Sequence, residues 1–406
     1  MSDILDAFKE TSATITTESD GRRLRIGIIG CGGIAKRHAE AYLHMPDVDI
    51  VAGCDLIPGK AEEFMRGFGI ENAKTHYQSH EEMLADESLE LDAVSVCTYN
   101  RQHVCCSIAA LNRGISVLLE KPLCVTMDEA WELYEAKKQS KGVISIGFQP
   151  RFDENMRDIC RVIESGVLGK VYYVQTGGGR RHGIPYRDTD LENTFVKDET
   201  AGIGAIGDIG CYSLDMVMNA LGHPKPLTVT GYKSNLLGRD PEYYYFSRDK
   251  KKNSDEEKRR LADSFTVDDF GAAFIRLEGG IIIDFRIAWA MHLDTPGDTI
   301  IYGTKGSLRI PSTNCWNGSI GGPMTIYHEV AGKQVQTVLP LAPERKASAP
   351  TLWDMKIRTF LDAVKGLGDV PVPLEQILYN QAMVSGIVES SELGREVTLD
   401  FSKMEK

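Results

Sequence analysis

The sequence lacks long apolar runs. None of its 406 residues lies in a run of about eighteen consecutive apolar residues, the length that a membrane-spanning helix needs. Its opening residues, MSDILDAFKETSATITTESD, also lack the charged start and apolar stretch of a signal peptide. We therefore expect no membrane partner and a cytoplasmic location.

Positive charge is in deficit. The chain has 46 Lys and Arg against 58 Asp and Glu, which gives a net charge of -12 at pH 7. Nucleic acids and anionic membranes require a basic face, because binding releases counterions from their phosphates. The charge balance therefore argues against nucleic acid as a partner.

The cysteines form no disulfide or metal-binding pattern. There are nine, an odd number, with no C-x-x-C pair, and several lie within apolar runs, as Cys54 and Cys97 do. This usage is typical of buried free thiols in a reducing compartment. The sequence therefore predicts no metal site.

Alternating strand and helix patterns fill the first part of the chain. The length suggests two domains, and 42% hydrophobic with 26% charged residues is typical of a globular protein. Capping signals at Ser79 with Glu82 and at Thr126 with Glu129 mark helix starts between apolar runs. This alternation predicts an α/β Rossmann domain with a parallel sheet. The expected strands are 25–29, 48–54, 93–97, 115–119 and 143–148.

A glycine-rich turn follows the first expected strand. The stretch GCGGIA places Gly30, Gly32 and Ala35 at G-x-G-x-x-A spacing, between a strand and a helix. Gly33 and Ile34 complete the turn, which can bind a pyrophosphate at the helix N-terminus. In this context the turn predicts a dinucleotide site, whereas alone it could be a plain tight turn.

An acidic residue ends the second expected strand. Asp55 lies twenty positions beyond Ala35, where a carboxylate can bind both hydroxyls of a ribose. The same carboxylate would repel a 2′-phosphate by roughly 4 kcal/mol at about 4 Å and an effective dielectric near 20. No arginine follows to offset that repulsion, so the sequence favours NAD over NADP. The alternative is a solvated turn carboxylate.

Polar residues follow the later strands, at the edge where open α/β sheets bind ligands. Thr98 and Asn100 would line the nicotinamide side of the crevice, with His103 at the start of the next helix. Glu120 and Lys121 end another strand and precede Pro122. Singly, each has an ordinary alternative: a helix cap for Asn100, a first-turn residue for His103, and an exposed ion pair for Glu120 with Lys121.

Together these features resemble the glucose-fructose oxidoreductase and inositol dehydrogenase family, Gfo/Idh/MocA, from Arg25 to about Asp400. The resemblance rests on GCGGIA, Asp55, CTYNRQH, EKP, the RF and ESGVLGKV segment, GIGAIGDIGCYSLD and IYGTKGSLRI. It implies a Rossmann domain joined to an α+β domain with a large, open, mostly antiparallel sheet. It also implies a bound nicotinamide cofactor and oxidation of a sugar or polyol hydroxyl.

The resemblance assigns Lys121 to the substrate hydroxyl. Hydride can leave carbon only as the hydroxyl proton is removed, so a group near the oxygen must accept or relay that proton. Burial beside a positive nicotinamide ring disfavours a charged lysine and can bring it toward neutrality. Glu120 could pair with Lys121 or orient it.

The segment GIGAIGDIGCYSLDMV is expected to supply further catalytic groups. Asp208 and Tyr212 are four positions apart and would share a helix face. Family members commonly carry D-x-G-x-H-x-x-D here, so in this chain Tyr212 replaces a histidine. By resemblance Tyr212 positions the oxygen and Asp208 binds a hydroxyl; the alternative for Tyr212 is a packing aromatic.

Two further segments remain open. TGGGRRHGIPYRDTD offers Arg180, Arg181, His182, Tyr186 and Arg187, which suit either a hydroxyl-rich ligand or subunit contacts. His182 is a second candidate base, and the resemblance adds Arg151, like Arg180 and His182, as a substrate-binding residue. Residues 233–263 are expected to be a solvated insertion, or alternatively a lid.

The resulting prediction is an NAD-dependent dehydrogenase of a sugar or glycoside, with C3 the favoured position by resemblance, in a homo-oligomer. The alternatives are an NAD-dependent glycosidase that oxidises transiently and eliminates, and a noncatalytic NAD-binding regulator. The expected parts are an N-terminal extension (1–22), the NAD-binding domain (23–148), the substrate and oligomerisation domain (149–372), and a C-terminal helix and tail that pack back on the Rossmann domain (373–406).

Overall fold

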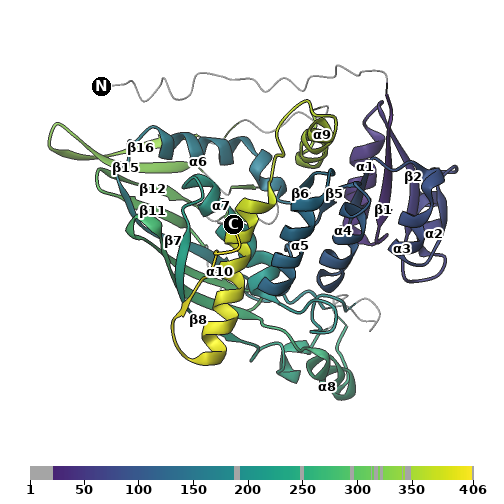
Figure 1. The fold of residues 1–406 in the computed structure, drawn as a ribbon. Helices are drawn as coiled ribbons and strands as arrows, with labels where there is room; N and C mark the ends of the chain where they lie inside the picture. Colours follow the sequence, from purple (N-terminus) through teal and green to yellow (C-terminus); the bar gives the residue numbers. More distant parts are fainter. Residues whose placement is uncertain are drawn as a thin grey trace. The chain divides into compact units, whose positions relative to one another are not determined.

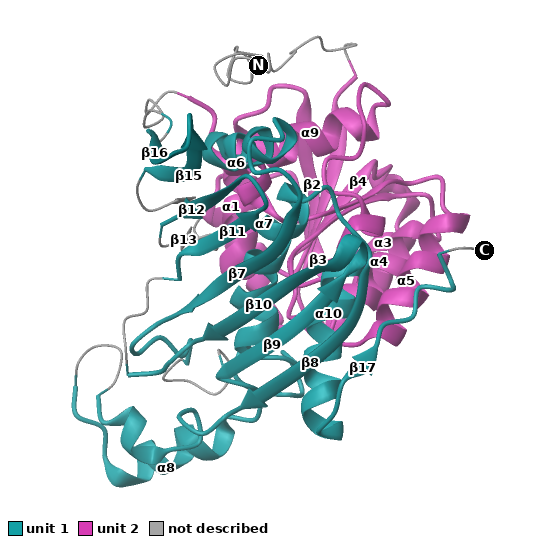
Figure 2. Cartoon of the chain, turned by 90° about the vertical axis from the view of Figure 1, so that its left-hand side faces the viewer, with its two compact units in different colours: residues 1–10, 153–344, 379–406 teal, residues 11–152, 345–378 magenta. Residues whose placement is uncertain are grey.

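The structure, a computed structural model, consists of two compact units. It describes residues 22–186, 193–246, 251–292, 297–311, 313–314, 319–320, 323–340, 342 and 349–404. Among these, one unit comprises residues 22–152 and 349–378, and the other comprises the described parts of 153–342 together with 379–404 (Figure 2).

The first unit contains the predicted parallel sheet. Its six strands lie in the order β3-β2-β1-β4-β5-β6, and all five neighbouring pairs are parallel (Figure 1). The order reverses direction between β1 and β4, the position at which open α/β sheets bind ligands. The strands are β1 (Leu24–Ile29), β2 (Val48–Cys54), β3 (Lys74–Tyr77), β4 (Ala93–Val96), β5 (Ser116–Leu119) and β6 (Ile144–Ile146).

Helices follow the strands as expected. Ser79 and Thr126 accept hydrogen bonds from the backbone N–H groups of Glu82 and Glu129, so both predicted caps are confirmed. The helices are α1 (Gly33–Leu43), α2 (Lys60–Gly67), α3 (His80–Ala85), α4 (His103–Leu111) and α5 (Met127–Gln139). A later helix, α9 (Leu352–Val364), belongs to the same unit, because Ile357, Phe360 and Leu361 are buried in its hydrophobic core.

The second unit is built on a large open sheet, as the resemblance implied. Its nine strands lie in the order β16-β15-β12-β11-β7-β10-β9-β8-β17, and every pair except β7 with β10 is antiparallel. The strands are β7 (Val171–Gly179), β8 (Pro226–Ser234), β9 (Phe270–Leu277), β10 (Ile281–Ala288), β11 (Thr299–Gly303), β12 (Gly306–Ile310), β15 (Met324–Val330), β16 (Lys333–Leu339) and β17 (Val397–Thr398). Two short strands, β13 (Thr313–Asn314) and β14 (Ser319–Ile320), pair separately.

Helices cover one face of this sheet, and the other face carries exposed side chains. Phe285 and Ile275 are buried on the covered face, while Tyr232 and Phe274 are each 54% exposed on the opposite one. The helices of the unit are α6 (Glu154–Glu164), α7 (Cys211–Ala220), α8 (Asp255–Ser264) and α10 (Leu374–Leu393), whose first residues belong to the other unit. Short helical turns are η3 (Asn100–Gln102), η6 (Ile206–Gly210), η7 (Pro241–Tyr244) and η8 (Glu278–Gly280).

The unit boundaries differ from the predicted ones at the C-terminal end. Residues 349–378 group with the nucleotide-binding unit, whereas 379–404 group with the large sheet. The reason is that the end of α10 bonds to β8: Ser390 Oγ accepts from Gly231 N–H at 2.8 Å. In addition, β17 pairs with β8.

The predicted insertion at 233–263 contains an ordered helix in its described part. It includes η7 and α8, which begins with a capping box at Ser254 and Glu257. The predicted N-terminal extension lies almost wholly outside the described residues. No helix within the described residues is long and apolar enough to cross a membrane.

Candidate active site

The glycine turn has the shape that a pyrophosphate needs. Gly30 has φ +84°, and a Cβ there would lie 2.9 Å from the backbone of Cys97 and Thr98, so only glycine fits. A Cβ added at Gly32 or Gly33 would meet nothing within 4 Å, which leaves open space in front of the first turn of α1. The unpaired N–H groups of that turn can bind phosphate oxygens there.

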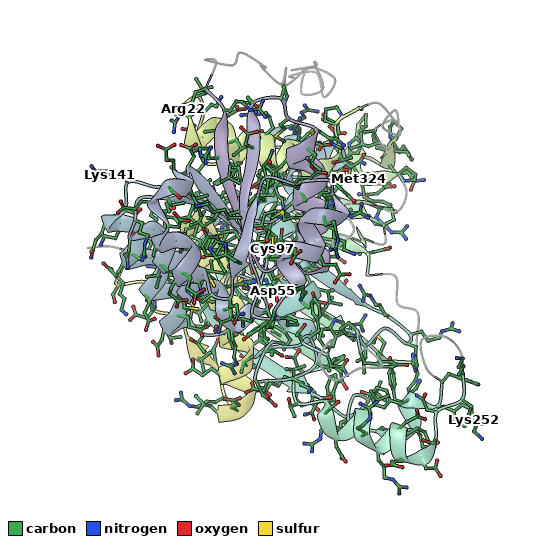
Figure 3. The ribbon with its side chains drawn as sticks, turned by 90° about the vertical axis from the view of Figure 1, so that its right-hand side faces the viewer. Arg22, Asp55, Cys97, Lys141, Lys252 and Met324 are labelled. Atoms are coloured by element: carbon green, nitrogen blue, oxygen red, sulfur yellow. The ribbon has the colours of Figure 1, made fainter. Side chains whose placement is uncertain are left out.

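Asp55 is built into this turn. Its Oδ2 accepts from Cys31 N–H at 2.9 Å, its Oδ1 accepts from Ile57 N–H at 3.0 Å, and its side chain is 9% exposed. The alternative of a solvated turn carboxylate therefore does not describe it. Figure 3 marks Asp55 and Cys97, which directly follow β2 and β4.

Lys60 is a residue that the sequence reading missed. Its Nζ lies 3.3 Å from Oδ2 of Asp55, on the first turn of α2. An ionised carboxylate has about four acceptor positions, so Asp55 can bond to Cys31, Ile57 and Lys60 and still accept from one ribose hydroxyl. Lys60 follows Asp55 by five positions, and that spacing was the available signal.

The polar segment after β4 contains Thr98, whose hydroxyl is suited to bind a ligand, and His103, which bonds to the protein backbone. Thr98 Oγ1 is buried, and no described residue provides it with a hydrogen-bond partner. His103 is 1% exposed, with Nδ1 2.7 Å from Pro122 O and Nε2 3.3 Å from Thr98 O. Burial lowers the pKa of His103, and the Nδ1 contact connects α4 to the turn at Pro122. Asn100 opens the short η3 helix that precedes it.

Glu120 is buried beside Lys121 and bonds to other partners. It is 3% exposed, and its Oε1 accepts from Lys356 Nζ at 2.7 Å. The same oxygen lies 2.9 Å from His38 Nε2, while Oε2 accepts from the Lys121 backbone N–H at 3.3 Å. The alternative of an exposed ion pair does not describe Glu120, which is buried and whose charge is balanced by Lys356, from α9.

The cluster around Glu120 was not predicted. Lys356 is fully buried, and its Nζ lies 4.1 Å from the centre of the Trp353 ring and 3.1 Å from His38 Nε2. His38 Nδ1 lies 2.9 Å from Ser95 Oγ. Burial and the Lys356 charge lower the pKa of His38 to about 4, and the Lys356 and His38 contacts lower the pKa of Glu120 despite its burial. Glu120 is thus a buried carboxylate paired with a buried lysine.

In the second unit Asp208 lies in a π-helical turn. That turn, η6, leads into α7, where Tyr212 is 4% exposed, so the simple four-residue spacing of an α-helix does not apply. Asp208 Oδ2 accepts from Trp289 Nε1 at 3.0 Å. π-helical turns within helices are frequent at functional sites.

Arg180 and His182 lie in the same unit. Burial lowers the pKa of Arg180, and the charge of Asp208 partly offsets that effect, so the two groups interact electrostatically. The His182 ring stacks on Tyr243 at 3.8 Å, and its Nε2 lies 2.9 Å from Tyr243 O. Since a carbonyl accepts only from a protonated nitrogen, Nε2 carries the proton and Nδ1 is the basic atom.

Two other predicted ligand residues are bonded within the protein. Arg151 Nη1 donates to Gln376 Oε1 at 2.5 Å, within the nucleotide-binding unit. Tyr186 is buried and its hydroxyl donates to Phe246 O at 2.8 Å. Arg187 lies outside the described residues.

A group of possible metal ligands is also present. Donor atoms of His80, Cys105 and Cys106 lie within 4.8 Å of one another, although the sequence reading predicted no metal site. A hydrogen bond from the Cys106 thiol lowers the pKa of Cys105 to about 7. Adjacent cysteines on one helix gave no recognisable ligand spacing, and His80 joins them from α3 only in the fold.

The parallel sheet, the glycine turn and Asp55 define a dinucleotide-binding oxidoreductase with an appended open-sheet domain. The chain belongs to the GFO/IDH/MocA family: the description "Oxidoreductase family, NAD-binding Rossmann fold" matches residues 24–148, and "GFO/IDH/MocA C-terminal domain" matches 156–309. The protein is therefore an oxidoreductase that uses NAD.

Relatives agree with this assignment. D-glucoside 3-dehydrogenase of Escherichia coli (strain K12) is 26% identical over 379 residues, 93% of this chain and 97% of that protein. Inositol 2-dehydrogenase of Salmonella paratyphi B (strain ATCC BAA-1250 / SPB7) is 32% identical over 149 residues, 36% of this chain and 43% of that protein. The solved structure of levoglucosan dehydrogenase in complex with NADH is similar in fold, with a TM-score of 0.73 and 20% identity over 93% of this chain and all of that one.

Proposed function

We propose that the protein oxidises a secondary ring hydroxyl of a sugar or glycoside, with C3 of a glucoside the favoured position. The support is the similarity to D-glucoside 3-dehydrogenase, which extends over 97% of that relative. The relatives compared above are all named as dehydrogenases of sugars or polyols, and nothing among them supports the glycosidase or regulator alternatives.

One observation carries the catalytic proposal. Glu120, the carboxylate next to Lys121, is already paired with Lys356 at 2.7 Å. The Glu120 charge is thus balanced by Lys356, and the charges of Lys121 and Lys356 act on each other. A like charge nearby makes a lysine lose its proton more readily. Lys121 is therefore suited to accept or relay the hydroxyl proton.

The reaction balances with these groups. NAD, when bound, supplies the nicotinamide carbon that accepts hydride from the substrate carbon. The hydroxyl proton passes to the Lys121 amine, the carbon–oxygen bond becomes a carbonyl, and the ammonium later returns its proton to solvent. Asp208, Tyr212 and Arg180 bind the other hydroxyls, and Nδ1 of His182 is the second candidate base.

NAD binding is assigned to the turn and the neighbouring strand ends. Gly30, Gly32, Gly33 and Ile34 would hold the pyrophosphate, and Asp55 the ribose hydroxyls. Thr98 Oγ1, buried without a partner among the described residues, is suited to hydrogen-bond the nicotinamide side. Asn100 is assigned to the same side. His103 and Glu120 would hold the Lys121–Pro122 backbone in place through their hydrogen bonds to it.

We also propose that the protein is a homo-oligomer in the cytoplasm. The face of the large sheet opposite the helices exposes Tyr232 and Phe274, and exposed aromatic rings on a flat face suit a subunit interface. The eight described cysteines form no disulfide with one another, as is usual in a reducing compartment.

The test is NADH absorbance after a panel of glucosides is added to the protein with NAD. We expect absorbance to rise with the wild type and with Lys141→Ala, an exposed lysine of the same unit, but not with Lys121→Ala. An equal rise in Lys121→Ala would refute the role of that lysine. Release of the aglycone without net NADH would support the glycosidase, and no change with any glucoside would contradict the substrate class.

A further inference from the structure

Glu120 and Lys356 form a buried ion pair next to the proposed base, Lys121. Glu120 precedes Lys121 in the chain, and its Oε2 accepts from the Lys121 backbone N–H at 3.3 Å. A Cβ at Gly147, the residue after β6, would lie 2.6 Å from Oε1, so the chain there leaves the carboxylate little room. The position of Glu120 is thus coupled to that of the Lys121 peptide.

The cation comes from a distant part of the chain. Lys356 lies 236 residues after Glu120, on α9, and is 0% exposed. A buried carboxylate without a partner is costly, so it would take its positive charge from the nearest available group. While Lys356 is present His38 does not supply it near neutral pH, because burial and the Lys356 charge lower the pKa of His38 to about 4.

Without Lys356, the nearest ammonium in sequence would be that of Lys121 itself. Lys121 and Lys356 already interact, because the charge of Lys121 lowers the pKa of Lys356. Such a coupling is reciprocal, so the charge of Lys356 must act on Lys121 in the same sense.

We infer that Lys356 is a positioning residue for Lys121: it holds Glu120 against the Lys121 backbone N–H and balances the Glu120 charge, which would otherwise act on the Lys121 ammonium. It touches neither cofactor nor substrate in this role. The inference rests on the proposed function of Lys121, but its first test does not need turnover.

That test measures the protonation of Lys121 by competitive labelling with acetic anhydride, quantified on its peptide by mass spectrometry as a function of pH. Exposed Lys141 is the internal reference. The titration is followed above about pH 8, where an unpaired buried carboxyl or imidazole has lost its proton. For Lys356→Met we expect the apparent pKa of Lys121 to rise by about one to two pH units, because Glu120 then carries an unbalanced charge.

Two variants test whether the shift in the Lys121 titration is caused by the charge of Glu120. Lys356→Met combined with Glu120→Gln removes both charges and should return the Lys121 titration close to that of the wild type. Lys365→Met is the matched control, because Lys365 lies just beyond the end of α9 and its Nζ pairs with Asp47 Oδ2 at 3.0 Å instead. It should lower stability without shifting the titration. Should Lys356→Met fail to fold, Lys356→Gln replaces it, since an amide can still donate to Glu120.

An unchanged Lys121 titration in Lys356→Met, or an equal shift in Lys365→Met, would overturn the inference. Activity separates it from the proposed function. If Lys121→Ala keeps full activity on glucosides, the proposed role of Lys121 fails even where the titration shifts as expected. If Lys121→Ala is inactive and Lys356→Met titrates like the wild type, only the positioning role fails.

Discussion

Replacing Asp55 with asparagine should reverse the preference for NAD over NADP. The change removes the negative charge at the ribose site and keeps the side-chain volume. Lys60, whose Nζ lies 3.3 Å from Oδ2 of Asp55, would then lose its carboxylate partner and be available to a 2′-phosphate.

The expected magnitude follows from two terms. A carboxylate about 4 Å from a phosphate charge costs roughly 4 kcal/mol at an effective dielectric near 20, and Lys60 already offsets part of it, so NADP should gain about 2 kcal/mol. NAD should lose about 1.5 to 3 kcal/mol with its hydrogen bonds to a charged group. Since about 1.4 kcal/mol is a factor of ten, the ratio of the two dissociation constants should change by roughly a thousandfold.

The assay is calorimetric titration of wild type and variant with each cofactor, without substrate. Asp86→Asn is the control, because Asp86 pairs with Lys74 at 2.7 Å at the end of α3, away from the glycine turn. Asparagine cannot accept from both Cys31 and Ile57 as Asp55 does, so distortion of the turn is the competing explanation. Equal weakening of NAD and NADP would point to that distortion and refute the charge argument.

Three further predictions concern other parts of the protein. The alkylation rate of Cys105 should titrate with a pKa near 7. Cys106→Ala should move that pKa toward the ordinary thiol range, because the hydrogen bond from the Cys106 thiol causes the shift. An unchanged pH profile in the variant would contradict this. His38 binds a proton less readily in the folded state, so the free energy of unfolding should fall as pH drops from about 6.5 to about 4. Chemical unfolding of His38→Gln should not show this dependence on pH. An identical dependence in the variant would exclude His38 as its source. Phe274→Glu should reduce the subunit count in sedimentation if the exposed sheet face is an interface, while an unchanged count would place the interface elsewhere.

Features that depend on neighbours in sequence were predictable. Gly30 and Asp55 are defined by a strand, a tight turn and the next strand end, and the structure places them together through Cys31 N–H at 2.9 Å. The turn at Gly279, between β9 and β10, is equally local, because its φ of 77° favours glycine. These contacts close short loops or connect adjacent parallel strands.

Features that depend on distant segments were not predictable. Glu120 and Lys121 look like an exposed ion pair in sequence, because nothing near them reveals that Lys356 reaches the same point from α9. The only signal was a lysine between apolar neighbours in an amphipathic helix. The π-helical turn around Asp208 was not predictable for another reason, since such a turn has no distinctive sequence.

The membership of α9 in the nucleotide-binding unit has a consequence for synthesis. Domains generally fold as units while the ribosome proceeds from the N-terminus. Here the first domain to be translated receives part of its hydrophobic core, Ile357, Phe360 and Leu361, only after every strand of the second unit's large sheet except β17 has been made. Until Lys356 has been translated, Glu120 lacks its buried cation. The nascent Rossmann domain therefore cannot complete its core before α9 is made.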